Sequence, residues 1–349
     1  MEIQGLEVGF RLLPKRHFQA MPLFEHARNQ KYSAADVRMN ALMTCLLALL
    51  VMAALAPLAA ADLPAGETPP GKVLLVPQPH HDDHSTDYGM AGLIARLVDE
   101  GFRAIYIRAS NDEKDGRHGY PRNDMINERE TKEAIAVLGM EKVISLNWRN
   151  NFESGYALND LREQLIFLIR KYKPDVILGH NPWEHYQKNA GHRNVGWMLE
   201  EAILLAGLRN AHPEHFEMGV EPHAASYFYG KARLTWGLGH RPNIVMEFNA
   251  DQQKRKETAF QLHRNVRAHP AGARSLRRQL ARMNLYVPEF ENLDDQEIAV
   301  LTANWSMEHV SRLHGSHAGV EFGEEYYFMD EFYELPGLKG FFGENIETR

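Results

Sequence analysis

The chain has 349 residues, which is enough for one large domain or two smaller ones. Its hydrophobic content of 44% and its charged content of 24% are those of a soluble globular protein with a sizeable core. The net charge of -7 argues against nucleic acid as a partner. The single cysteine, Cys45, excludes a disulfide framework and a cysteine-rich zinc site.

The N-terminal part of the chain contains a long apolar segment. Residues 41–61 carry no charge, basic residues precede them, and small residues end them at Ala59-Ala60-Ala61. A basic flank, an apolar core and an Ala-x-Ala site are typical of a secretory signal, with a membrane-anchoring helix as the alternative. Met39 directly precedes the segment, so translation from Met39 is a second interpretation of residues 1–38. We expect an exported protein, periplasmic or secreted, that contacts a membrane only if this segment stays uncleaved.

Residues 62–71 hold three prolines and two glycines and are predicted to be a linker. After the linker, short apolar runs alternate with amphipathic segments. The apolar runs predict strands at 72–76, 102–108, 143–146, 176–178, 225–230 and 243–248. The amphipathic segments predict helices at 90–98, 123–138, 158–172, 195–206 and 252–263. This alternation predicts a Rossmann-like three-layer α/β/α fold with a mostly parallel sheet and an active site at the carboxyl ends of its strands.

The last part of the chain has a weaker pattern. Five arginines between residues 267 and 282 are interpreted as the solvated face of a helix. The aromatic and acidic segment 324–333 is expected to pack as a C-terminal element on the main sheet, with a wall of the substrate site as the sharper alternative.

The most informative stretch is His80-His81-Asp82-Asp83-His84, which follows the first predicted strand. Imidazoles and carboxylates crowded in this way are costly unless a cation lies among them. His80 and Asp83, three residues apart across a turn, can converge on one metal ion, while Asp82 points elsewhere and is available as a general base. The alternative is a turn whose aspartates cap the next helix. For His84 and Asp87 we expect such a cap, or support of a ligand.

A catalytic zinc ion usually has three protein ligands and one open position. The third ligand should come from another strand end or helix start, and the fourth predicted strand is followed by three candidates: His180, His185 and His192. A lone histidine at the end of a strand is more often a hydrogen-bonded structural residue, and we interpret His180 in that way.

The motif around His80 resembles the His-Pro-Asp-Asp signature of the PIG-L/LmbE-like zinc de-N-acetylases, with His81 in place of the proline. The resemblance covers about residues 72–263. It implies zinc ligands at His80 and Asp83 and a general base at Asp82. It divides the chain into an N-terminal extension with a signal or anchor (1–61), a linker (62–71), a deacetylase domain (72–265) and a C-terminal extension packed on the same domain (266–349).

Later stretches extend the resemblance. The family's third ligand is the last His of a His-Pro-x-His stretch followed by x-x-x-Gly, which implies His192 here, with Gly196 in its place and His185 as the second choice. The loop with Asn111 and Asp112 resembles one that touches sugar in relatives. His263 ends a stretch that resembles a Lys-x-x-Ala-x-x-x-His helix.

One departure from the family pattern concerns proton transfer. Asn189 stands where the family has the first His of that stretch, which is thought to steady the oxyanion or to protonate the leaving group. His263 is our first choice to replace it, followed by His185 and Tyr186.

Another departure concerns substrate binding. Asn127 stands where relatives have a substrate-binding Arg, so we expect Arg122 or Arg129 to do this work. The substrate is then open to differ from a standard N-acetylglucosaminyl group.

The resemblance and the motif together predict a zinc-dependent N-deacetylase acting on linear amides, in which metal-bound water attacks the amide with Asp82 as the base. The expected substrate is an N-acylated amino sugar or glycoconjugate, and the expected cofactor is Zn²⁺, with Fe²⁺ as the alternative because His₂Asp ligation tolerates either ion. Two other functions stay open: a sugar-binding relative with weakened catalysis, and a metal phosphoesterase.

Overall fold

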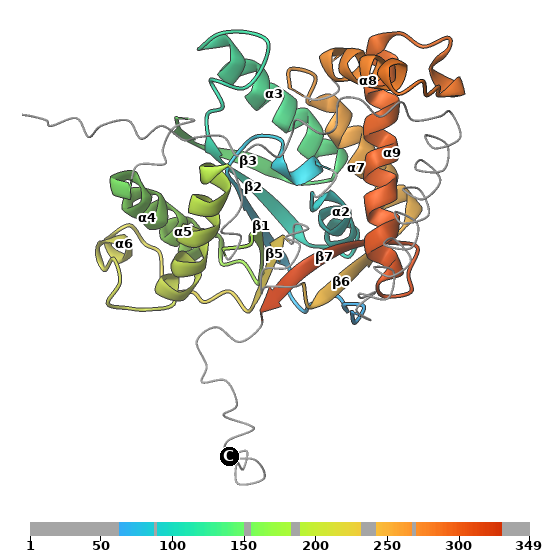
Figure 1. Ribbon diagram of the computed structural model, residues 1–349. Coiled ribbons are helices and arrows are strands. Elements are labelled where there is room, and N and C mark those ends of the chain that lie inside the picture. Colours follow the sequence, from blue (N-terminus) through green and yellow to red (C-terminus); the bar gives the residue numbers. More distant parts are fainter. Residues whose placement is uncertain are drawn as a thin grey trace, which may run out of the picture. The chain divides into compact units, whose positions relative to one another are not determined.

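Seven strands form one sheet in the part of the chain that the computed structural model describes, which is residues 63–86, 89–149, 155–182, 189–231, 242–266 and 270–329. The strands are β1 (Val73–Gln78), β2 (Arg103–Ser110), β3 (Lys142–Trp148), β4 (Val176–His180), β5 (Tyr227–Lys231), β6 (Ile244–Phe248) and β7 (Phe322–Met329). Their order is β3-β2-β1-β4-β5-β7-β6 (Figure 1). The predicted signal or anchor lies outside the described residues.

The sheet is mostly parallel, as predicted. Strands β1 to β5 pair in parallel, whereas β7 runs antiparallel to both of its neighbours, β5 and β6. The chain moves outward from β1 through β2 to β3 and then returns to place β4 on the other side of β1. This reversal between β1 and β4 is a topological switch point, where ligands bind in open α/β sheets.

Helices lie on both faces of the sheet, and α9 lies beside the edge formed by β7 and β6. They are α2 (Ala91–Asp99), α3 (Arg122–Val137), α4 (Gly155–Tyr172), α5 (Ala190–Ala206), α6 (Glu214–Glu217), α7 (Ala250–Leu262), α8 (Pro270–Arg282) and α9 (Asp295–Ser316). Two 3-10 turns, η1 (Asp83–Ser85) and η2 (Pro288–Phe290), complete the described elements. Among the described residues, no helix combines the length and apolar character that crossing a membrane requires.

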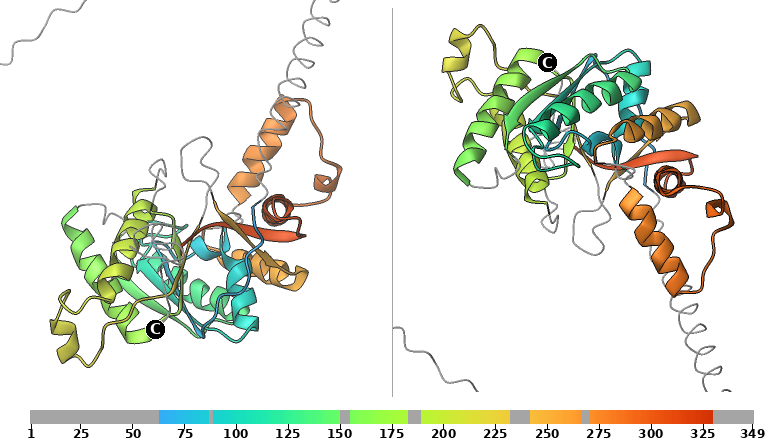
Figure 2. Two further views of the ribbon diagram at one scale, coloured as in Figure 1. Left: turned by 90° about the horizontal axis from the view of Figure 1, so that it is seen from below. Right: turned by 90° about the horizontal axis from the view of Figure 1, so that it is seen from above.

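The alternation of side chains along β1 builds a core on each face. Leu75 packs with residues of α4 and α5, whereas Leu74 and Val76 pack with residues of α2, α3 and α7. Figure 2 shows these two helical layers on opposite faces of the sheet. Each fully buried Leu or Val contributes about 1.5–3 kcal/mol. The three-layer α/β/α architecture predicted from the sequence is therefore confirmed.

Boundaries differ from the predicted ones where a cap decides them. Helix α5 begins at Ala190, five residues before the predicted start, because the Asn189 side chain accepts a hydrogen bond from the Gly191 amide at 2.9 Å. The extra turn brings His192 into the helix. Helix α9 was not predicted, although Asp294 and Glu297 form a capping box at its start.

The aromatic segment near the end of the described chain is a strand of the sheet. Strand β7 lies between β5 and β6, and α9 packs beside it. The Glu324 carboxylate on β7 accepts hydrogen bonds from the amides of Gly92 and Leu93 at the start of α2, and it pairs with Lys256 of α7 at 2.8 Å. One buried carboxylate thus ties β7 to two helices of the same face.

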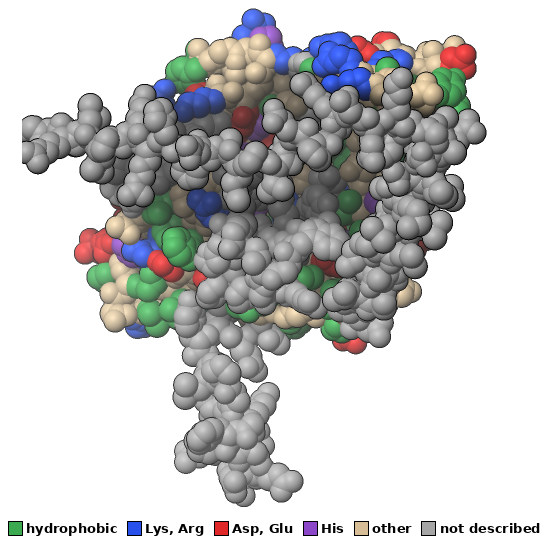
Figure 3. Space-filling model, in the orientation of Figure 1, with side chains coloured by type: hydrophobic (Ala, Val, Ile, Leu, Met, Phe, Trp, Pro, Cys, Tyr) green, Lys and Arg blue, Asp and Glu red, His purple; other side chains and the backbone are tan. Residues whose placement is uncertain are grey.

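The arginine-rich segment forms α8, as the helical pattern indicates. Arg274, Arg278 and Arg282 are exposed, and basic side chains gather on the surface over this helix (Figure 3). Arg274 and Arg277 lie near Asp295 at the start of α9. The interpretation as a solvated face fits this placement.

Candidate metal centre

Three side chains from two separate segments meet at the switch point. The Nδ1 atom of His80 lies 3.1 Å from Oδ2 of Asp83 and 3.0 Å from Nε2 of His192. The Nε2 atom of His192 lies 3.2 Å from Oδ1 of Asp83. All three residues are buried. This is the convergence that the metal-ligand prediction requires, while the ligand roles themselves stay predictions.

The distances are those of hydrogen bonds and are also close to the spacing of ligand atoms around a metal ion. Two imidazole nitrogens face each other at 3.0 Å, and both contact the same carboxylate. Zinc-to-nitrogen bonds of about 2.0–2.1 Å hold neighbouring ligand atoms of a tetrahedron roughly 3.3 Å apart. Two imidazoles and one carboxylate also leave a coordination position open, as catalytic zinc sites do.

Local structure brings the ligands together. His80 and Asp83 flank the turn after β1, where Asp83 Oδ2 accepts a hydrogen bond from the His80 amide at 2.9 Å. His192 lies in the first turn of α5. A Cβ on Gly196 would lie 3.0 Å from the carbonyl oxygen of His180, so this glycine lets α5 approach the end of β4. Gly196, which the family pattern places four residues after His192, therefore has a packing role here.

The charge state of the triad favours cation binding. Burial alone lowers the pKa of His80, but the adjacent Asp83 carboxylate raises it to about 10. Burial alone raises the pKa of Asp83, yet the imidazoles of His192 and His80 hold it well below its usual value. Burial lowers the pKa of His192. The shifts of His80 and Asp83 have the same cause, which is that a positive charge among these three side chains is favourable.

His180 lies beside this cluster, and its interpretation as a structural residue stays a prediction. Its Nε2 atom lies 3.9 Å from Oδ2 of Asp83, and its ring centroid lies 4.3 Å from that of His192. Burial, together with the neighbouring His192, holds the pKa of His180 well below its usual value. No spacing signal in the sequence separated His180 from an ordinary strand-end histidine.

Asp82 lies between the triad and a second pair. Its side chain is buried, and its Oδ1 atom lies 4.0 Å from Nδ1 of His81. The same nitrogen of His81 lies 3.1 Å from Oδ2 of Asp112, which also accepts a hydrogen bond from the His81 amide at 3.0 Å. His81, which replaces the family's proline, therefore links the base candidate to the loop after β2.

His263 and His84 lie behind this pair. Neither exposes any surface, and the ring centroid of His263 lies 5.3 Å from that of His81 and 5.2 Å from that of His84. Burial lowers the pKa of His84 to about 3, so this imidazole is neutral. The hydroxyl of Tyr106, a residue the sequence reasoning missed, donates to the backbone carbonyl of His80 at 2.7 Å.

The residues predicted to bind substrate lie in different environments. Asn111 and Asp112 are buried at the carboxyl end of β2, beside the triad's own loop. Arg129 is not brought to the site: its side chain is 64% exposed on α3 and lies beside Glu133. Arg122 is exposed as well. His185 and Tyr186 lie outside the described residues, as does Asp87.

Asn127, which stands where relatives carry a substrate-binding Arg, has a structural task here. Its side-chain amide donates to the backbone carbonyls of Asp112 and Asp115 at 3.2 and 2.9 Å, and it accepts from Asn265 at 2.7 Å. Asn127 therefore holds the loop that carries Asp112. It does not bring a positive charge to the site, as an Arg at this position would.

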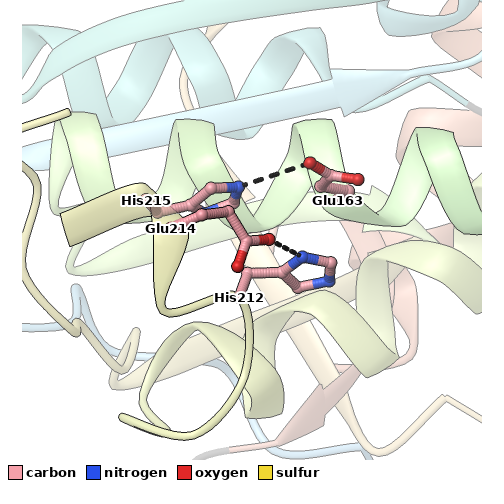
Figure 4. Close-up of side chains that lie close together, drawn as sticks. All are labelled: Glu163, His212, Glu214 and His215. Atoms are coloured by element: carbon pink, nitrogen blue, oxygen red, sulfur yellow. Dashed lines mark hydrogen bonds and ion pairs between the residues drawn. The ribbon is translucent and has the colours of Figure 1, made fainter. Parts of the chain in front are cut away.

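A second histidine and carboxylate cluster lies at α4 and α6, away from the strand ends. It consists of Glu163, His212, Glu214 and His215 (Figure 4) and borders a cavity of about 380 Å³. Arg170 donates to Nδ1 of His215 at 3.2 Å, which places the proton of a neutral His215 on Nε2, the nitrogen that faces Glu163. A cationic neighbour and a protonated Nε2 both disfavour a metal ion there.

The fold and the triad together define an α/β/α protein with a His₂Asp cluster that could hold a metal ion at the switch point of its sheet. Comparisons with known proteins show what this part of the chain resembles. Residues 75–203 match the family model described as GlcNAc-PI de-N-acetylase, PIG-L. The segment that carries all three residues of the triad therefore matches the PIG-L/LmbE-like family.

Two known deacetylases are similar to this chain, one in sequence and one in fold. The diacetylchitobiose deacetylase of Thermococcus kodakarensis is 27% identical over 198 residues, which cover 55% of this chain and 68% of that protein. The solved N,N'-diacetylchitobiose deacetylase of Pyrococcus horikoshii superposes with a TM-score of 0.55 at 22% identity, over 74% of this chain and 84% of that chain.

The same fold also carries other chemistry. The 4-carboxy-2-hydroxymuconate hydratase GalB of Pseudomonas putida superposes with a TM-score of 0.54 at 15% identity, over 76% of this chain and 99% of that chain. Function must therefore be argued from the site residues and not from the fold.

Proposed function

We propose that the protein is a metal-dependent amide hydrolase that removes an N-acetyl group from an amino sugar or glycoconjugate. The observation that carries the proposal is the convergence of His80, Asp83 and His192 within 3.0–3.2 Å of one another, with Asp82 beside them. The T. kodakarensis relative, named for deacetylation of diacetylchitobiose, supports the reaction and the substrate class.

In this proposal His80, Asp83 and His192 hold a divalent ion, with Zn²⁺ first and Fe²⁺ second. Such an ion supplies water activation near neutral pH and polarisation of the amide carbonyl. These three residues lie at the carboxyl ends of the strands, where a ligand enters an open sheet.

Asp82 accepts the proton of the attacking water and returns it to the leaving nitrogen as the C–N bond breaks. The Asp112–His81 pair holds the turn that carries this carboxylate. His263 is enclosed by the rings of His81 and His84, so we assign it to positioning His81 and not to direct proton transfer.

The test is acetate release from a panel of N-acetylated amines, measured with and without a chelator. We expect release from at least one N-acetylated amino sugar, loss of release with chelator, and recovery when metal is restored. Asp82→Asn should keep its metal and lose about 10²–10⁴-fold in kcat. Asp251→Asn, at an exposed carboxylate on α7, is the matched control and should keep full activity.

A panel without acetate release, or an active Asp82→Asn variant, would contradict this proposal in separate ways. The first result would remove the activity, and the second would remove Asp82 as the base.

A metal phosphoesterase is the second candidate, because one observation favours it. His80, Asp112 and Asp115 form another group able to hold an ion, and it shares His80 with the triad. Two-metal phosphoesterases need such neighbouring sites, with ions roughly 3.5–4 Å apart. Metal analysis decides between the candidates: one ion per chain supports the deacetylase, and two support the phosphoesterase.

A further inference from the structure

Lys231 places a buried positive charge beside the metal centre. It is the last residue of β5, and only 3% of it is exposed. Its Cα is the register partner of His180 on the neighbouring parallel strand β4. Register partners on adjacent strands point to the same face of a sheet. The Lys231 side chain therefore projects from the same face as the His180 imidazole, which lies near Asp83.

The contacts of Lys231 agree with this direction. Its ammonium donates to the hydroxyl of Thr86 at 3.3 Å, and Thr86 follows the turn η1 that begins with the ligand Asp83. The ammonium therefore lies beside the turn that carries Asp83 and on the face of the sheet to which His180 points.

Amide hydrolysis needs a positive group at this place. When water adds to the acyl carbon, negative charge develops on the acyl oxygen, and donors fixed in a water-excluded site stabilise that charge most strongly. Asn189, the position where the family resemblance implies a histidine for this task, uses its side chain to cap α5. Lys231 is a cation that the register of β4 and β5 places near the site, where it could act beside the metal ion.

We propose that the ammonium of Lys231 is a catalytic group that stabilises the oxyanion formed on the acyl oxygen during deacetylation. This inference rests on the proposed function. In the addition step, a bond forms between the water oxygen and the acyl carbon, and Asp82 takes the water proton. The electron pair of the C=O double bond moves to the acyl oxygen, which faces Lys231.

The second step restores the balance. The electron pair returns to re-form C=O, the C–N bond breaks, and the nitrogen takes the proton from Asp82. Acetic acid and an amine are the products, and at neutral pH the acid passes its proton to the amine, which gives acetate and an ammonium ion. Lys231 keeps its proton throughout, because its part is electrostatic.

The test compares Lys231→Met, Lys231→Gln and Lys231→Arg in the full, metal-loaded protein. A group that acts only in the transition state lowers kcat and kcat/KM equally and leaves KM unchanged. We expect about a 10²–10³-fold loss in kcat for the Met and Gln variants, the size found when one oxyanion donor is removed. Lys231→Arg should recover part of this loss. Lys142→Met, at an exposed lysine on β3, is the matched control and should match the parent.

Binding measurements separate catalysis from a structural role. A phosphonamidate analogue of the acetamide carries the charge of the tetrahedral intermediate. Its Kd for the Met variant should rise by the same factor by which kcat/KM falls, while bound metal and the substrate Kd stay at parent values.

Three results would overturn the inference while leaving the proposed function intact: a Met variant with kcat within about threefold of the parent, a rise in KM alone, or loss of metal from both the Met and Gln variants. Parent protein that releases no acetate from any N-acetylated amine overturns the proposed function and this inference together.

Discussion

Burial keeps His314 neutral on α9, the helix that packs against β7. This residue lies on α9 and is 4% exposed. Burial lowers its pKa to about 4, although the Glu325 carboxylate at 3.7 Å acts in the opposite direction. Lys256 and His317 are the other charged or titratable groups that act on it. His314 therefore links protonation to the stability of the packing between α9 and β7.

The lowered pKa of His314 is expected to make the folded protein less stable in acid. Between about pH 6.5 and 4 the unfolded chain binds a proton at His314 that the folded protein does not, so stability falls as the pH falls. From about pH 7 to about pH 5, His314 should remove about 2 kcal/mol from the free energy of unfolding. Urea unfolding of His314→Gln at both pH values should show this much less acid sensitivity than the parent protein shows. Equal acid sensitivity in the two proteins would contradict the prediction.

Single residues of the site were predictable only where they belong to a motif. His80, Asp82 and Asp83 stand together in the sequence, and His192 stands at a family spacing from Gly196. His180 and Lys231 carry no such signal, because 51 positions separate them and only the pairing of β4 with β5 makes them neighbours. The position of Arg129 was not predictable either, since helix periodicity alone did not reveal that its face of α3 lies in solvent.

At the scale of elements, one arginine fixes the end of α5. Arg170 on α4 is fully buried, and its guanidinium donates to backbone carbonyls at distances of 2.7–3.3 Å: those of Leu205, Ala206, Leu208, Ala211 and His212. It also lies 4.9 Å from the ring of Phe216. A cation is favourable at the C-terminal end of a helix, where carbonyls lack partners inside the helix.

Arg170→Met should therefore destabilise the fold without damaging the site. Five carbonyls would lose their donor. That of Ala206 is buried and the others are partly buried, so at about 1–3 kcal/mol for a buried group left unpaired and less for a hydrated one, we expect a total loss of about 3 kcal/mol. The triad lies at the other end of α5, roughly 20 Å away at 1.5 Å per residue, so activity per folded molecule should stay the same. Urea unfolding and kcat measured together check both statements.

Arg162→Gln is the matched control on the same helix. Arg162 pairs with Glu201 of α5, but its partner is 42% exposed. A surface pair of this kind is worth about 0–1 kcal/mol. A similar loss of stability in both variants would mean that the buried carbonyls are not the cause.

Most elements were predictable because their signals are local. Strand runs and helical periods placed β1 to β6 and five helices within a few residues. The missing turn of α5 depended on Asn189 acting as a cap, which is also visible in the sequence. By contrast, no local signal states that β7 inserts between β5 and β6, because that pairing joins residues about 75 to 100 positions apart.

At the scale of the whole molecule, the proposed metal ion joins two parts of the chain. His80 and Asp83 come from the β1 loop, and His192 comes from α5, more than a hundred residues later. An ion that binds only the folded protein stabilises it by RT ln(1 + [L]/Kd), which is about 4 kcal/mol at a free concentration 1,000 times Kd. Ion binding should therefore be visible in thermal unfolding.

Removing metal with a chelator and then adding Zn²⁺ should raise Tm by about 10 °C, because a domain of this size gains about 2–4 °C for each kcal/mol. His192→Ala should lose most of this shift while it stays folded. Differential scanning calorimetry provides the measurement. The same rise in the parent and in His192→Ala would show that Zn²⁺ binds elsewhere.

The place of β7 in the sheet also constrains biosynthesis. Its neighbours β5 and β6 are complete long before residue 329 leaves the ribosome, yet each keeps an open inner edge until β7 arrives. An open edge is a template for pairing with another chain. The amides of Gly92 and Leu93 at the start of α2 also lack their hydrogen-bond acceptor, the Glu324 carboxylate, during this time. We therefore expect the nascent domain to need chaperone binding or rapid completion of synthesis. A chain whose synthesis stops within α9 is expected to aggregate through these open edges.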